Sequence, residues 1–312
     1  MIEIDGITKV YGEARAVDNV SLTVERGELA AIVGTSGSGK TTLMRMINRL
    51  VEPTSGTIRI DGRDNRDLPA YELRRGIGYA IQGHGLFPHR TVAENIATVP
   101  KLLGWDRKKR DERVDELLTL FNLEPELYRD RMPQELSGGQ KQRIGVARAL
   151  AAEPALLLMD EPFGALDPII RAKAQEDLLK IQRQFSTTVV LVTHDMDEAI
   201  LLGHRIGVMH EGKLLQYAPP AEIIAHPASD FVNELLGTGD KAFRMLSLTA
   251  ASKMVEEGPA EGPPIADTAS LRDALAQILW SGRDAVPVER DGVIIGRITR
   301  DRLLQRAEGP AS

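Results

Sequence analysis

The stretch from Gly34 to Thr41 constrains this chain more than any other part of its sequence. It reads Gly-Thr-Ser-Gly-Ser-Gly-Lys-Thr and fits the pattern G-x-x-x-x-G-K-[ST] at every position. An apolar, β-rich run at 28–33 precedes it, and a helical run at 40–50 follows it. In that context the backbone N–H groups of a glycine-rich loop converge on phosphate oxygens at a helix N-terminus. The sequence therefore predicts an α/β fold of the P-loop class that binds a nucleotide.

Each residue of this loop is a candidate ligand of MgATP. Lys40 is expected to reach the β- and γ-phosphates, and the Thr41 hydroxyl to bind Mg²⁺. ATP and Mg²⁺ are thus the expected cofactors. The predicted nucleotide-binding residues of the loop are Gly34, Thr35, Ser36, Gly37, Ser38, Gly39, Lys40, Thr41 and Thr42.

Two apolar runs end in polar residues that carry chemistry. The run 155–159 ends in Asp160 and Glu161, and the run 188–192 ends in Thr193 and His194. Neither run alternates with polar residues, which is typical of parallel strands covered on both faces, and such strands place functional groups at their carboxyl ends. We interpret Asp160 as a Mg²⁺ partner. Glu161, pointing the other way on an extended chain, is the expected general base for an attacking water.

The segment Leu136–Gln140, Leu-Ser-Gly-Gly-Gln, narrows the class of P-loop protein. It stands directly before a helical run at 141–151, so it predicts a second anion-binding helix N-terminus. The simpler alternative is a helix cap, because Ser137 is a good N-cap residue. One nucleotide does not readily occupy two cradles so far apart in the chain, which favours a second protomer as the user of this one.

With these elements in place, residues 1–237 resemble the nucleotide-binding subunit of an ABC transporter. The resemblance implies a β-rich N-terminal subdomain, an inserted helical subdomain at about 84–150 and a homodimer that encloses two MgATP molecules. It implies catalytic roles for Glu161, His194 and Gln82, with Gln82 also bound to Mg²⁺ and His194 donating to the γ-phosphate. The further nucleotide contacts that it implies are Tyr11, stacked on adenine, the signature residues Ser137, Gly138, Gly139 and Gln140, and Asp167 of the D-loop.

Two segments indicate a subfamily. Gly85–Ile96 resembles importer ATPases, and residues 97–105 are similar to the osmoprotectant branch, which takes up glycine betaine, choline, carnitine or proline-type solutes. The implied partners are membrane permease subunits and a solute-binding protein, and no nucleic acid. An importer ATPase for another small solute, such as an amino acid, remains an alternative, as does a soluble ABC ATPase outside transport. A small-molecule kinase would leave Leu136–Gln140 unexplained.

The last part of the chain, 238–312, predicts a separate α+β unit. After a Gly/Pro-rich stretch at 258–264, a helix is expected at 270–280, strands at 285–288 and 293–298, and a helix at 299–306. Ser270 and Asp273 form a capping-box pair. The unit resembles a single CBS motif, with Arg302 where the ligand-binding copies tend to carry aspartate. A unit this small is not expected to bury all of its apolar residues, so we expect two tails to pair and cover them. The apolar residues concerned are Leu275, Ile278, Leu279, Val286 and Ile294.

Composition excludes several other classes. The 312 residues include no cysteine, so there is no disulfide framework and no thiol nucleophile. The net charge of −6 offers no basic surplus for non-specific nucleic-acid binding. The longest apolar runs fall far short of the roughly 20 residues of a membrane helix, and the N-terminus lacks a signal-peptide pattern. We expect a cytoplasmic protein, peripheral on the inner face of a bacterial membrane.

Overall fold

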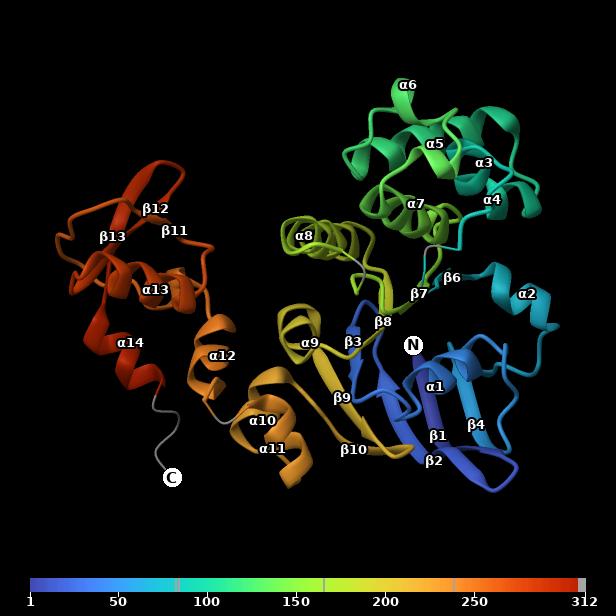
Figure 1. Ribbon diagram of the computed structural model, residues 1–312, viewed down its shortest axis with the longest axis horizontal. Coiled ribbons are helices and arrows are strands. Elements are labelled where there is room, and N and C mark those ends of the chain that lie inside the picture. Colours follow the sequence, from blue (N-terminus) through green and yellow to red (C-terminus); the bar gives the residue numbers. More distant parts are fainter. Residues whose placement is uncertain (82, 84, 165, 238, 308–312) are drawn as a thin grey trace. The chain divides into compact units, whose positions relative to one another are not determined.

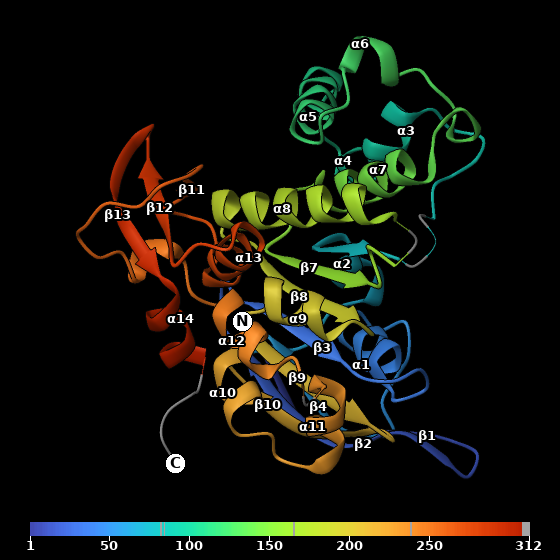
Figure 2. The same ribbon diagram turned by 60° about the vertical axis from the view of Figure 1, so that its left-hand side comes forward.

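The computed structural model describes residues 1–81, 83, 85–164, 166–237 and 239–307 (Figure 1 and Figure 2). The chain divides into two compact units. The first unit contains residues 1–195 and 202–217, and the second contains 196–201 and the chain from 218 onward. The predicted domain boundary at 237/238 stays a prediction.

The first unit alternates strands and helices as the phosphate-loop pattern predicts. Its elements are β1 (Ile2–Tyr11), β2 (Ala14–Val24), β3 (Leu29–Val33), α1 (Lys40–Ile47), β4 (Ser55–Ile60), β5 (Arg63–Asp64), α2 (Ala70–Arg75), β6 (Ile77–Ala80), α3 (Val92–Ile96), α4 (Thr98–Leu102), α5 (Arg107–Leu120), α6 (Pro125–Tyr128), a 3-10 turn (Pro133–Glu135), α7 (Gly138–Leu150), β7 (Leu156–Asp160), α8 (Pro168–Phe185), β8 (Thr188–Thr193), β9 (Arg205–His210) and β10 (Lys213–Ala218).

The described strands of this unit form two sheets. The larger has the order β10-β9-β3-β8-β7-β6, with parallel pairing from β9 through to β6. Every residue of β3, β7 and β8 is buried, which confirms the parallel sheet predicted from their continuous apolar sequences. The smaller sheet, β2-β1-β4-β5, is antiparallel and forms the predicted β-rich N-terminal part.

Helix α1 carries the phosphate loop at its N-terminus and packs into one core with both sheets. Leu43 and Met46 of α1 share a buried cluster with Ile2 of the smaller sheet and with Leu158 and Val190 of the larger one. The helix ends at Ile47 rather than at the predicted residue 50, since Arg49 adopts a positive φ of 53° and turns the chain. The loop is thereby fixed between two sheets.

Helices α3 to α7 form the predicted helical insertion, gathered in a layer of their own (Figure 1). One side of α5 faces the core of this layer, because Val114, Leu117, Leu118 and the C-cap residue Phe121 are all buried. Figure 2 shows α8 running along one face of the larger sheet, beside β7 and β8. With the parallel core and the β-rich part, this insertion confirms the predicted α/β fold class.

The second unit has a core of its own, which joins α12 to the tail elements. Strands β11, β12 and β13 form a sheet in that order, and Glu256 exchanges two backbone hydrogen bonds with Arg297 on the outer side of β13. The predicted capping box of Ser270 and Asp273 is present at the start of α13. The elements of the second unit are α9 (Met196–Leu202), α10 (Pro220–Ala225), α11 (Asp230–Leu236), α12 (Lys241–Ser247), a 3-10 turn (Ala251–Lys253), β11 (Ile265–Ala266), α13 (Leu271–Ser281), β12 (Ala285–Arg290), β13 (Val293–Thr299) and α14 (Arg300–Ala307).

Candidate functional site

The phosphate loop leaves the carboxyl end of β3 and passes close to two neighbouring backbones. A Cβ atom at Gly34 would clash with the carbonyl oxygen of Met209, and one at Gly39 with that of Ala16. Both glycines have positive φ angles, of 158° and 101°. Only glycine satisfies the close approach at these positions, so the glycine pattern reflects packing as well as turn geometry. Gly37, at the loop tip, is exposed.

Lys40, the first residue of α1, folds back over the loop. Its Nζ donates to the carbonyl oxygens of Gly34 at 2.7 Å and Thr35 at 2.8 Å, and contacts Ser38 Oγ at 3.4 Å. Only 5% of Lys40 is exposed. Burial lowers the pKa of Lys40, while the nearby carboxylate of Glu161 opposes that shift. The Lys40 ammonium group is therefore suited to exchange these loop carbonyl oxygens for phosphate oxygens.

Thr41 and Asp160 meet beside the loop although they lie far apart in sequence. The Thr41 hydroxyl donates to Asp160 Oδ1 at 3.0 Å, joining the start of α1 to the end of β7. Asp160 is almost fully buried, and this burial raises the pKa of its carboxyl group, against the opposing effect of the Thr41 hydrogen bond. A hydroxyl and a buried carboxylate are hard oxygen ligands, the donor set that Mg²⁺ prefers. The residues present therefore fit the expected ion.

Glu161 and His194 form a pair at the ends of β7 and β8. The His194 Nδ1 atom lies 3.3 Å from Glu161 Oε2, and 57% of the histidine side chain is exposed. The prediction that Glu161 continues an extended chain is wrong. Its φ is +47°, because the chain turns sharply after Asp160 while the Glu161 amide still donates to Val192 O. This left-handed turn, rather than strand alternation, aims its carboxylate at His194.

Tyr11 is half exposed at the turn between β1 and β2, where it pairs with Ala14. The Nζ atom of Lys9 lies 4.9 Å from the centre of its ring. The same β2 strand reaches the loop, because Ala16 abuts Gly39. An exposed ring face in this position is accessible to a planar ligand.

The signature segment begins α7 three residues earlier than predicted, since Gly138 and Gly139 form its first turn. Ser137 caps this helix: its Oγ accepts from the Gln140 amide at 3.3 Å, and Gln140 Oε1 accepts from the Ser137 amide at 2.9 Å. The helix-cap interpretation is thus confirmed. It does not exclude ligand binding, because the Ser137 hydroxyl keeps its proton to donate, and Ser137 and Gly138 are exposed.

Two predicted site residues remain, Asp167 and Gln82. Asp167 caps α8, its Oδ1 accepting from the amides of Ile169 and Ile170. Gln82 lies outside the described residues. Sequence reasoning missed Arg171, which donates to the carbonyl oxygen of Leu166 and forms an ion pair with Asp195. Its place one helical turn after Asp167 was the available signal, and spacing alone does not reveal its partners.

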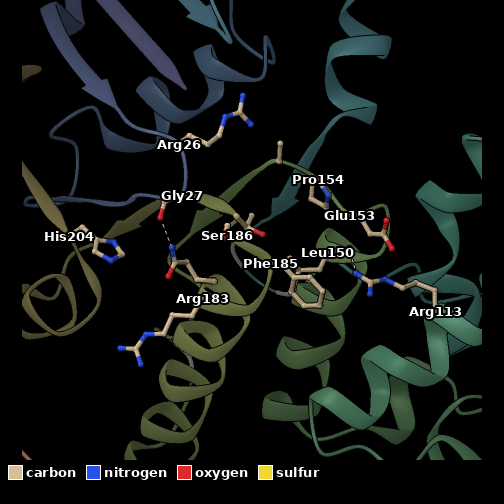
Figure 3. Close-up of a pocket in the computed structure, with 13 residues that line it drawn as sticks. Arg26, Gly27, Arg113, Leu150, Glu153, Pro154, Arg183, Phe185, Ser186 and His204 are labelled. Carbon is tan, nitrogen blue, oxygen red and sulfur yellow. Dashed lines mark hydrogen bonds between the residues drawn. The ribbon is translucent and has the colours of Figure 1, made fainter. Parts of the chain in front are cut away.

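A cavity lies elsewhere, at the amino ends of β3, β7, β8 and β9 (Figure 3). It has a volume of about 960 Å³, and no predicted site residue lines it. The Gln182 side chain donates to Gly27 O at its wall, and Arg113 donates to Leu150 O. We place the functional site at the phosphate loop instead, because functional groups in α/β sheets lie at the carboxyl ends of strands.

Of the described helices, none is both long and apolar enough to span a bilayer.

Comparisons with known proteins bear on the family of this chain. The sequence profile of the ABC transporter family matches residues 17–164. A glycine betaine uptake system ATP-binding protein of Escherichia coli (strain K12) is 48% identical over 289 residues, which cover 92% of this chain and 94% of that protein. A glycine betaine/carnitine/choline transport ATP-binding protein of Bacillus subtilis (strain 168) is 55% identical over 76% of this chain. The chain spans 62% of the length of that second relative.

The fold is also similar to a solved dimeric ATP-binding cassette in a post-hydrolysis state with ADP and Pi. The two share 35% sequence identity with a TM-score of 0.64, and the match covers 70% of this chain and 99% of that chain.

Proposed function

Because the chain belongs to the ABC transporter family, whose ATP-binding subunits hydrolyse ATP, we propose that it energises a membrane permease for uptake of a quaternary-ammonium osmoprotectant. The observation that carries this proposal is the convergence of Lys40, the Thr41–Asp160 pair and the Glu161–His194 pair at one end of the parallel sheet.

In the proposed reaction, water attacks the γ-phosphate of ATP and ADP leaves. The Glu161 carboxylate accepts the proton of that water, and His194 donates a hydrogen bond to the γ-phosphate, where charge develops. Lys40 leaves the carbonyls of its own loop and binds phosphate oxygens. Tyr11 stacks on adenine, with the positive charge of Lys9 on the same side of the turn.

Thr41 and Asp160, together with Gln82, would hold Mg²⁺ in this proposal. The ion would supply positive charge that offsets the negative charge of the phosphate oxygens. The buried Asp160 carboxylate supports the assignment, since an anion with a raised pKa gains most from a cation beside it.

Two copies of the chain enclose the nucleotides, each between the loop of one protomer and Ser137–Gln140 of the other. The exposed Ser137 and Gly138 support this role, because a Cβ at Gly138 would meet nothing within 4 Å and the backbone is open to a ligand. Ile169, beside Asp167, supports it as well: 84% of this apolar side chain is exposed in a single copy.

The permease docks near Gln82 and the helical insertion. A hollow of about 200 Å³ beside β6 and α7 has Leu50, Val99, Arg74, Arg75 and Arg148 among its lining residues. Apolar side chains are exposed on the same insertion, namely Phe87, Leu102 and Leu103. Apolar contacts with a basic surround suit a short permease segment that carries an acidic group. This docking places the chain at the cytoplasmic face of the membrane.

The solute is assigned from relatives, because the ATPase does not touch it. The printed names of the E. coli and B. subtilis relatives specify glycine betaine, carnitine and choline. We propose a solute of this class, delivered by a solute-binding protein.

The test is uptake of labelled glycine betaine, choline and amino acids at raised osmolarity by the native cell with its own gene deleted. The wild-type chain should restore uptake of a quaternary amine, and the Glu161→Gln variant should not. Restored uptake of an amino acid alone would reassign the solute. No restored uptake, with ATP hydrolysis by the purified chain intact, would favour a role outside transport.

A further inference from the structure

Arg171 connects two loops that must stay in register for the proposed site to work. It lies in α8, one turn after Asp167, and its guanidinium reaches in two directions. Nη2 donates to the carbonyl oxygen of Leu166 at 3.3 Å, and Nη1 lies 3.7 Å from Oδ2 of Asp195. Leu166 belongs to the loop before α8, and Asp195 follows His194 after β8. One side chain therefore joins the D-loop to the histidine loop.

The D-loop end of this connection is stiff. The Asp167 side chain accepts from the amides of Ile169 and Ile170, and its carbonyl accepts from the Arg171 amide at 2.8 Å. The loop and the first turn of α8 thus move together, and Arg171 moves with them. Asp167 and Ile169 are exposed, so this turn is open to contact from a second copy of the chain.

The histidine end lies one residue from the chemistry. The Asp195 amide donates to Thr193 Oγ1 at 3.0 Å, so the two residues on either side of His194 are both held. His194 itself contacts Glu161 at 3.3 Å. Because Arg171 binds Asp195, a shift of the D-loop reaches the histidine that flanks the proposed general base.

Arg171 also has one donor that makes none of these contacts. Its Nε atom is buried and has no hydrogen-bond partner within the part of the chain that the structure describes. A buried donor without a partner is costly, and such groups in native structures call for an explanation. A rearrangement of the D-loop or of the loop after β8 that brings an acceptor to Nε would remove this cost and would therefore be favoured.

We propose that Arg171 is a positioning residue for ATP hydrolysis, coupling contact by a second copy at the D-loop to the placement of His194 against Glu161. This inference rests on the proposed function. Among the described residues, the hydrogen bond and the ion pair of the Arg171 guanidinium go to Leu166 and Asp195 rather than to Lys40 or the phosphate loop, so its loss should slow turnover and leave ATP binding largely unchanged. The assignment concerns kcat rather than KM.

The experiment measures steady-state hydrolysis by the full-length chain over a range of ATP concentrations. Arg171→Met should lower kcat about tenfold to a hundredfold, the range expected when a catalytic group is misplaced. The KM for ATP should stay within about twofold, and Arg171→Lys should recover part of the loss. Lys173→Met is the matched control, because Lys173 lies on the same helix and pairs with Glu176 and Asp177 instead.

A double-mutant cycle with Asp195→Asn tests the coupling itself. If Arg171 acts through Asp195, the double variant should be no slower than the slower single variant. Losses that multiply, or an Arg171→Met variant that turns over within about twofold of wild type, would overturn the proposal. Melting temperatures are measured alongside. If Arg171→Met does not fold, Arg171→Lys and Asp195→Asn decide the question by the same split of kcat from KM.

The Glu161→Gln variant separates this inference from its premise. If Glu161→Gln hydrolyses ATP as fast as wild type, the proposed function fails and the Arg171 proposal falls with it. If Glu161→Gln is inactive while Arg171→Met is as active as Lys173→Met, the Arg171 proposal alone is wrong.

Discussion

The Nδ1 atom of His194 lies 3.3 Å from the Oε2 atom of Glu161, and the pair depends on a left-handed backbone at Glu161. Such a conformation costs a non-glycine residue free energy, and it persists where surrounding contacts enforce it. Here the Glu161 amide donates to Val192 O at 2.9 Å and ties the turn to β8. Strain held in this way is typical of functional positions.

Glu161→Gln should nearly abolish turnover and leave ATP binding intact. The amide oxygen can still accept a hydrogen bond from His194, but it cannot take a proton from water. We therefore expect kcat to fall by about 10²- to 10⁴-fold. Steady-state phosphate release and a separate ATP titration check the two halves of the prediction.

Glu153→Gln is the matched control for that prediction. Glu153 is also a glutamate with a positive φ, of 54°, but it lies at the amino end of β7 beside the cavity of Figure 3. The Glu153→Gln variant should hydrolyse ATP at the wild-type rate. Turnover by Glu161→Gln within a few-fold of this control would remove the general-base assignment.

Lys40→Ala should weaken ATP binding itself. The Lys40 ammonium is buried, and its hydrogen bonds to Gly34 and Thr35 place it where it can bind phosphate oxygens in their stead. A charged hydrogen bond is worth about 1.5–3 kcal/mol, so the Kd for ATP should rise roughly tenfold to a hundredfold. An equilibrium titration measures this, with Lys173→Ala as the control. Equal affinities for the two variants would contradict the role of Lys40.

Asp160→Asn should stabilise the nucleotide-free protein while abolishing Mg²⁺-dependent turnover. Burial raises the pKa of Asp160 above its unfolded value, so the folded state prefers the protonated form. The carboxylate therefore destabilises the fold at neutral pH, and this penalty disappears as the pH falls below the ordinary value of about 4. The variant should melt about 2–4 °C higher for each kcal/mol recovered.

Thermal melts of wild type and Asp160→Asn at neutral and acid pH check the sign of this effect. The difference should be largest at neutral pH and should shrink in acid. A variant that melts lower than wild type at neutral pH would show that the carboxylate contributes net stability through Thr41 and its neighbours.

Ser137 should act on the nucleotide of the other protomer. A mixture of Ser137→Arg and Glu161→Gln protomers forms one site with both lesions and one with neither. The mixture should therefore recover hydrolysis that neither variant shows alone, measured as phosphate release against mixing ratio. No recovery would mean either that composite sites do not form or that both sites must be intact. A nucleotide-bound dimer lacking contact with Ser137 would reject the trans geometry.

The tails should pair through apolar side chains that the second unit leaves exposed. Of the residues expected to exceed its core, Leu275, Ile278 and Val286 are buried, while Leu279 and Ile294 are 60% and 53% exposed. Trp280 is 94% exposed. Val293, Ile294 and Ile295 are exposed at the start of β13, before the bridge between Arg297 and Glu256. An exposed apolar stretch at a sheet edge tends to pair with another strand, so a second tail should cover it.

Trp280→Ser combined with Ile294→Ser should weaken dimerisation in sedimentation measurements and preserve ATP hydrolysis. Point variants are preferable to deleting 239–312, because Arg244 binds Asp197 and the deletion would break this ion pair. Leu127→Ser, at an equally exposed position on the helical insertion, is the control. Arg302 stands where the ligand-binding copies of the CBS motif tend to carry aspartate, so pairing should not require an adenine nucleotide. Undiminished dimerisation of the double variant would refute tail pairing.

The sequence by itself determined the local elements and the class of the protein. The glycine pattern before Lys40, the continuous apolar runs of β7 and β8 and the Ser270–Asp273 box each depend on neighbours within a few residues. Local spacing sets backbone conformation and burial, so these features are readable without a structure. The ABC transporter motifs are likewise short and contiguous.

Only the tertiary structure decided how those pieces meet. The Thr41–Asp160 hydrogen bond joins residues 119 positions apart, the first at the start of α1 and the second at the end of β7, two strands away from β3 in the sheet. The left-handed turn of Glu161 and the double contact of Arg171 likewise depend on strands and loops remote in sequence. Contacts between residues that are remote in sequence depend on how the whole unit packs. A local sequence pattern therefore does not predict them.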